Sequence, residues 1–140
     1  MKSNKPLLLG ILVYMALSLI GINTIAQTLT IKGSVTLNDK SSFEMVKVSI
    51  AEVDTAGFTN QMTYDVVKGF KFELEDNKNY LIVVQKSGFQ SKAISINTNH
   101  TSNSRYLYSF IVNLSDSEIV SKYPEQAGGI YYNKSKKEYD

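Results

Sequence analysis

Few side chains in this sequence have the chemistry of a catalytic centre. His100 is the one histidine among the 140 residues, and there is no cysteine. A hydrolytic zinc site takes about three protein ligands, and a nucleophilic triad needs a base beside a serine, so both would depend on His100. This residue lies in the polar segment 97–104, and we interpret it as a solvated loop histidine. We predict no catalytic residue, no metal site, no cofactor and no enzyme.

Acidic residues are densest at Glu73, Glu75 and Asp76. Two converging carboxylates can cleave a glycosidic bond, which keeps a small hydrolase open as a minor alternative. Strand alternation puts Glu73 and Glu75 on the polar face of their strand, so we favour a solvated edge and turn. Asp116 and Glu118 are too sparse for a calcium loop, and no glycine loop that would hold a phosphate is present.

Tyrosine offers contact area for sugars and for protein partners. Tyr106 and Tyr108 share a strand face with Phe110, which favours the core. The candidates for partner binding are in the irregular C-terminal segment: Tyr123, Tyr131 and Tyr132. Docking of these rings onto their own domain is the open alternative.

The tripeptide Asp54-Thr55-Ala56 resembles the acceptor of some bacterial envelope O-glycosylation systems. If it serves as one, Thr55 carries a glycan. An ordinary turn leading into Gly57 is the favoured reading, because so short a motif often arises by chance.

The N-terminal segment has the organisation of a secretory signal peptide. Lys2 and Lys5 precede an apolar run over residues 7–22, and small and polar residues follow. We predict a signal peptide over residues 1–26, with cleavage between Ala26 and Gln27. A retained helix is the weaker alternative, because the run is shorter than the ~20 residues that span a bilayer. We therefore expect an exported protein, periplasmic, outer-membrane-associated or secreted, that touches a membrane only through an uncleaved signal segment.

Charge disfavours nucleic acid as a partner. The chain has 15 basic and 13 acidic residues, and two of the basic ones, Lys2 and Lys5, leave with the predicted signal. The remaining residues are balanced, without the basic excess that nucleic-acid binding requires.

Strand patterning dominates the rest of the sequence. Apolar residues alternate at Leu29, Ile31, Val35 and Leu37, at Val46, Val48 and Ile50, at Phe70, Phe72 and Leu74, at Ile94 and Ile96, and from Tyr106 to Leu114. Phe58, Met62 and Tyr64 alternate loosely, and Gly33 indicates a bulge or a close approach. Residues 80–84 are apolar in both phases, as in a central strand covered on two faces.

About seven strands with frequent turns predict an all-β sandwich over residues 27–114. The alternation fails after Leu114. We expect residues 115–140 to form an irregular C-terminal tail, partly docked or disordered, with a mobile end from Lys134.

Residues 31–98 resemble the carboxypeptidase regulatory-like domain, a prealbumin-like (transthyretin-like) family. The resemblance rests on residues 31–35, 43–50 and 69–74, and on the segment 80–89 that ends in Gly88-Phe89. It implies a Greek-key β-sandwich in which Gly88 permits a tight turn and Phe89 covers the sandwich end. Met45 and Lys68 depart from the family pattern in turn details.

The resemblance carries little chemistry, because such domains accompany peptidases or receptors that are not present here. We expect a non-catalytic accessory or interaction module of a bacterial cell envelope. Its partner is an unknown envelope protein, bound by a strand edge or by the tail. The alternative is a carbohydrate-binding module that uses exposed tyrosines to bind a glycan.

Overall fold

The structure of the chain is a computed structural model that describes residues 28–38, 46–66, 68–99, 105–116 and 121–140. The predicted signal segment, with Ala26 and Gln27, lies outside the described residues. So does His100.

The described residues form β-strands and no helix. Seven strands lie between Thr28 and Leu114, as predicted: β1 (Thr28–Leu37), β2 (Val46–Asp54), β3 (Gly57–Val66), β4 (Gly69–Glu75), β5 (Asn79–Gln85), β6 (Lys92–Asn97) and β7 (Tyr106–Leu114). Three more follow: β8 (Glu125–Ile130), β9 (Tyr132–Asn133) and β10 (Glu138–Tyr139).

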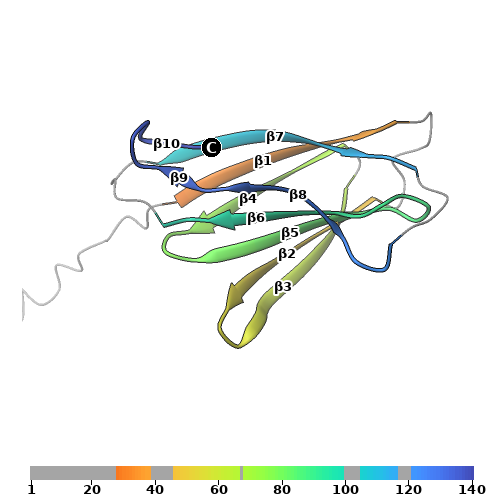
Figure 1. Ribbon diagram of the computed structural model, residues 1–140, viewed down its shortest axis with the longest axis horizontal. Coiled ribbons are helices and arrows are strands. Elements are labelled where there is room, and N and C mark those ends of the chain that lie inside the picture. The colour runs from red at the N-terminus through yellow and green to blue at the C-terminus, as the bar shows by residue number, and fades with distance from the viewer. Residues whose placement is uncertain (1–27, 39–45, 67, 100–104, 117–120) are drawn as a thin grey trace, which may run out of the picture.

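Two packed sheets make up the body of the molecule (Figure 1). One has the strand order β4-β1-β7 and the other β3-β2-β5-β6-β8, while β9 and β10 form a small separate hairpin. β1 pairs with β7 in parallel, and β6 pairs with β8 in parallel. The predicted all-β sandwich is therefore confirmed.

Alternate residues of the strands face one shared core. Leu29, Ile31 and Val35 of β1 meet Val46, Val48 and Ile50 of β2 and the buried residues of β5 and β6, and all belong to one apolar cluster. Gly33 is the close approach that the sequence predicts, because a Cβ there would lie 2.1 Å from the ring of Phe70. There is no bulge at this glycine, since the β1–β4 and β1–β7 registers run through it unbroken.

The turn after β5 has the expected form. Gly88 has φ +82°, which an L side chain rarely adopts, and the Phe89 amide donates to the Lys86 carbonyl at 3.1 Å. Phe89 is buried in the core cluster. The glycine and aromatic pair thus turns the chain and closes one end of the sandwich.

The prediction that β5 is covered on both faces is confirmed for its inner face only. Tyr80, Ile82 and Val84 are buried in the core, but Leu81 and Val83 lie half-buried on the outer face of the five-stranded sheet. No described element packs over that face. Two apolar side chains of a central strand are therefore partly open to solvent.

A β-bulge explains the loose alternation in β3. The register slips between Ile50 and Glu52, and Asn60 opposite this point has φ +50°. Met62 pairs with Ile50 on the inner face, whereas Phe58 pairs with Val53 on the outer face. Phe58 and Met62, both exposed, therefore point to opposite sides of the sheet.

The C-terminal segment contains three short strands that the expected irregular tail did not include, and its described part is docked on the sandwich. β8 hydrogen-bonds along β6, and β9 pairs with β10. Ile130 and Tyr139 are buried in the core cluster. The segment becomes ordered because β6 offers unpaired backbone groups and the end of the sandwich offers apolar surface, neither of which is visible in local patterning.

Candidate binding surfaces

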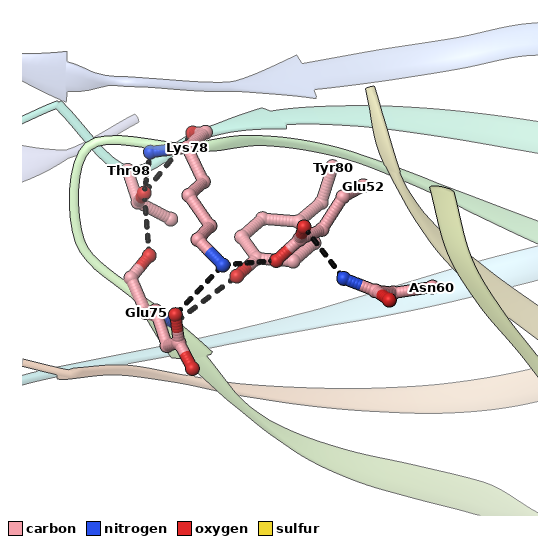
Figure 2. A network of polar contacts seen from close by, with 6 residues as sticks. All are labelled: Glu52, Asn60, Glu75, Lys78, Tyr80 and Thr98. Carbon is pink, nitrogen blue, oxygen red and sulfur yellow. Dashed lines mark hydrogen bonds and ion pairs between the residues drawn. The ribbon is translucent and has the colours of Figure 1, made fainter. Parts of the chain in front are cut away.

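A polar network joins the β4–β5 turn to β2 and β3 (Figure 2). The Lys78 ammonium forms ion pairs with Glu52 and with Glu75, the latter at 2.7 Å. Asn60 donates its side-chain amide to the second oxygen of Glu52 at 2.9 Å. The two carboxylates therefore share one cation, and the residue at the β3 bulge holds Glu52 in place.

Thr98, which is fully buried, fixes the same turn. Its hydroxyl donates to the Glu75 carbonyl at 2.7 Å and accepts from the Lys78 amide at 2.9 Å. The Thr98 amide donates to the Lys78 carbonyl at 2.9 Å. One buried side chain thus ties the turn to the end of β6.

The network keeps its groups charged at neutral pH. The hydrogen bond from Lys78 lowers the pKa of Glu52 below its ordinary value of 4.5. Hydrogen bonds to Glu52 and Glu75 raise the pKa of Lys78. Burial raises the pKa of the nearby Tyr80 phenol. A carboxylate held ionised and an amine held protonated stabilise the turn, and neither is poised to accept or release a proton at pH 7.

Glu73 and Glu75, which were singled out from the sequence, are each engaged in a separate ion pair. Glu73 forms an exposed ion pair with Lys71 at 3.1 Å, and Glu75 is held by Lys78. Both lie on the outer face of β4, whereas Leu74 between them is buried. Among the described residues, no three His, Cys, Asp or Glu side chains converge on one point.

The candidate tyrosines of the tail have different environments. Tyr132 packs against Tyr106 and Tyr139, with ring centroids 5.5 Å away in each case, and Tyr106 donates its hydroxyl to that of Tyr132 at 3.3 Å. Tyr123 and Tyr131 are exposed. The structure thus brings Tyr132 into an intramolecular cluster and leaves the other two at the surface.

Thr55 is exposed at the tip of the two-residue β2–β3 hairpin. The Asp54 carboxylate accepts from the amides of Ala56 at 2.7 Å and Gly57 at 3.0 Å. Asp54 therefore shapes the turn whatever the fate of Thr55, and glycosylation of Thr55 stays a prediction.

The outer face of the five-stranded sheet carries a shallow groove of about 340 Å³. Phe58 and Tyr131 stand at its two sides, 64% and 59% exposed. Its floor includes Val53 and Leu81, and Ser95, Asn79 and Asn97 supply polar groups. The residues that line it carry no charge. The sequence did not identify Phe58 as a residue of this surface. Strict alternation would place Phe58 and Met62 on the same face of β3, but the bulge between them places Phe58 on the opposite face.

The second unassigned surface is the edge strand β7. It pairs with β1 through nine consecutive residues, and the sheet order leaves its other side without a strand among the described residues. Leu107 and Ile111 lie on the outer face, 61% and 70% exposed. Their alternation with the aromatic residues was present in the sequence, but only the sheet order shows that this strand is at an edge.

Comparisons with known proteins add no family. No protein-family model matches the sequence, and no curated protein does. Among solved structures, the chain is similar to 3-chlorocatechol 1,2-dioxygenase from Rhodococcus opacus 1CP, with TM-score 0.44 and 11% identity over 66% of this chain and 60% of that one. Catechol 1,2-dioxygenase from Acinetobacter radioresistens gives TM-score 0.44 and 12% identity over 73% and 58%.

The chain therefore spans less than two thirds of the length of these enzymes. Similarities at this level carry no argument about the activity of this chain. The part of the chain that the structure describes also contains no helix long and apolar enough to cross a membrane.

Proposed function

We propose that this chain is a non-catalytic, exported module of the bacterial cell envelope, similar to carboxypeptidase regulatory-like domains, that captures a protein partner at the β7 edge. The signal-like segment over residues 1–26 supports export. The observation that carries the binding function is a long, regular and uncharged edge strand with exposed aliphatic side chains.

An exposed edge strand is a template for pairing with another strand, and proteins normally protect it with charges, prolines, bulges or a covering element. β7 reads Tyr-Leu-Tyr-Ser-Phe-Ile-Val-Asn-Leu, without a charge, proline or glycine. Its register with β1 has no bulge. Its nine residues therefore have no charge, proline, glycine or bulge, and among the described residues β10 packs beside the strand only through Tyr139 on Tyr106, where β7 begins.

The other three edges of the two sheets each have such a protection. β4 presents Lys71, Glu73 and Glu75 on its outer face. β3 is interrupted by its bulge, and β8 has a register shift and two glycines. The contrast favours β7 over the other three edges as the site of strand addition.

The partner is an extended segment of an envelope protein. Strand addition would supply backbone hydrogen bonds along β7, and apolar side chains at alternate positions of the partner would cover Leu107 and Ile111. This route is favoured over capture by the tail, because Ile130 and Tyr139 are committed to the core of their own domain.

Affinity capture from crosslinked envelope extract tests the proposal. The tagged protein is compared with Ile111→Lys, which places a charge beside the free edge, and with Ser34→Lys. Ser34 pairs with Ile111 but lies one strand inward on the same exposed face, so it is the matched control. We expect one partner that Ile111→Lys loses and Ser34→Lys retains. Equal recovery with all three proteins would reject the edge.

A further inference from the structure

The outer face of the five-stranded sheet has a composition that strand addition at β7 does not explain. Leu81 and Val83 of the central strand lie half-buried on this face, beside the buried small residues Ala51 and Ala93. Phe58 overhangs them from β3, since it lines a hollow with Ala51, Leu81 and Val83. A flat apolar floor with one ring above it thus lies on the solvent side of the sheet.

A second ring borders the same floor. Tyr131 follows β8, and the groove that it lines with Phe58 runs across the strands between them. β3 and β8 are the two outer strands of the sheet and are separated by four strand spacings, roughly 19 Å. The two aromatic residues therefore mark the ends of an elongated surface.

Asn79, Ser95 and Asn97 line the space between the rings, Gln126 lies beside it, and hydrogen bonds among these neutral groups hold them in place. Asn97 donates its side-chain amide to the side-chain oxygen of Asn79 at 2.7 Å, and Gln126 donates to the Ser95 hydroxyl at 3.2 Å. The remaining amide hydrogens of Asn79 have no partner among the described residues and lie beside the groove. The surface thus offers oriented donors and acceptors that carry no charge.

The chemistry of this surface selects among ligands. The groove has no cation for a phosphate or a carboxylate, and it lacks the arginine that is enriched in protein interfaces. Neutral sugars combine hydroxyls, which both donate and accept hydrogen bonds, with C–H faces that pack on the electron-rich face of an aromatic ring. Amides and two spaced rings on a flat floor match both features.

We infer that the outer face of the five-stranded sheet binds a neutral oligosaccharide or polysaccharide chain, with Phe58 and Tyr131 as stacking platforms and Asn79, Ser95, Asn97 and Gln126 as hydrogen-bonding groups. The ligand lies across the strands, along the line that joins the two rings. The site shares no residue with the β7 edge and does not depend on the function proposed for that edge.

Affinity electrophoresis tests the inference. The protein, purified after expression of the full chain, runs in gels that contain a neutral polysaccharide (mixed-linkage β-glucan, xylan, galactomannan or dextran) or the anionic polygalacturonate. We expect retardation by at least one neutral polysaccharide and none by polygalacturonate. Phe58→Ala and Tyr131→Ala should each weaken the apparent affinity about tenfold or more, in line with loss of a stacking contact.

Tyr123→Ala is the matched control, because Tyr123 is an exposed tyrosine of the same segment outside the groove. It should bind like the parent protein, and a thermal melt checks that all three variants fold. The inference is overturned if no neutral polysaccharide retards the protein, if Tyr123→Ala weakens binding as much as Tyr131→Ala, or if Phe58→Ala and Tyr131→Ala abolish capture of a protein instead. The polysaccharide should still retard the Ile111→Lys variant, because Ile111 lies on the β7 edge and not in the groove. This result would distinguish the two surfaces.

Discussion

The ring of Phe70 occupies the space that a side chain at position 33 would need, 2.1 Å from the point where a Cβ would stand. Gly33 and Phe70 are direct partners in the β1–β4 register, and Phe110 of β7 is the partner of Gly33 on the other side. The rings of Phe70 and Phe110 meet edge to face at 5.9 Å. A glycine in the middle strand thus lets two aromatic rings from its neighbours come together over it.

Replacing this glycine should destabilise the sheet. Gly33→Ala forces the Phe70 ring to move, and the expected loss is about 1–3 kcal/mol of unfolding free energy, measured by urea denaturation. Gly128→Ala is the control, since nothing lies within 4 Å of a Cβ there. The close approach is not a packing constraint if both variants unfold at the same urea concentration.

Removal of the Thr98 hydroxyl should cost stability without changing volume. Thr98→Val leaves the Lys78 amide and the Glu75 carbonyl without their partner, and a buried unsatisfied group costs about 1–3 kcal/mol. Thr98→Ser keeps the hydroxyl and should lose much less. Urea unfolding measures both variants, and a loss for Val no greater than that for Ser would show that the methyl group matters more than the hydrogen bonds.

The network around Lys78 should appear in the pH dependence of stability. The pKa of Glu52 is lower in the folded protein than its ordinary value of 4.5. Ionised Glu52 therefore stabilises the folded state at pH values above 4.5. This stabilisation is lost as the pH falls through the pKa that Glu52 has in the folded protein. Lys78→Met removes the main cause. Between about pH 5 and pH 3, the melting temperature of the parent should therefore fall more steeply than that of the variant.

Lys71→Met is the control for this comparison, because Lys71 pairs with Glu73 where both side chains are exposed. Its melting profile should follow that of the parent. Parallel profiles for the parent and Lys78→Met would mean that Lys78 does not stabilise ionised Glu52.

Two tyrosines of the C-terminal segment should differ in their contribution to folding. Tyr139 is 7% exposed and packs edge to face on Tyr106 at 5.3 Å, whereas Tyr123 is 72% exposed. Tyr139→Ala should lose about 3 kcal/mol, in the range for large aromatic deletions in a core. Tyr123→Ala should stay within about 0.5 kcal/mol of the parent. Equal effects in thermal or urea unfolding would mean that the β9–β10 hairpin is not docked.

Local alternation predicted the strands that carry the core. β1, β2, β4 and β7 each place every second residue inward, and the Gly88-Phe89 turn is visible in the sequence because few residues other than glycine adopt its conformation. β8 could not be predicted in this way. Its sequence, Glu-Gln-Ala-Gly-Gly-Ile, has low strand propensity, and the backbone of β6 supplies the pairing that makes it a strand.

The two candidate surfaces were hidden for a similar reason. Phe58 belongs to the outer face only because a bulge at Ile50/Glu52 shifts the phase of β3. Leu107 and Ile111 are part of an ordinary alternating strand, and their exposure at a free edge follows from the sheet order. Pairing between distant strands decides both, and no local pattern encodes it.

The most direct test of the proposed function is photo-crosslinking in intact cells from a benzophenone amino acid at position 109. Ser109 lies on the exposed face of β7 between Leu107 and Ile111, and Lys71 on the opposite edge strand β4 is the control position. We predict one discrete adduct with an envelope protein from position 109 and none from position 71. No adduct from position 109, the same adducts from both positions, or an adduct with a second copy of this chain alone would contradict capture of a protein partner at the β7 edge.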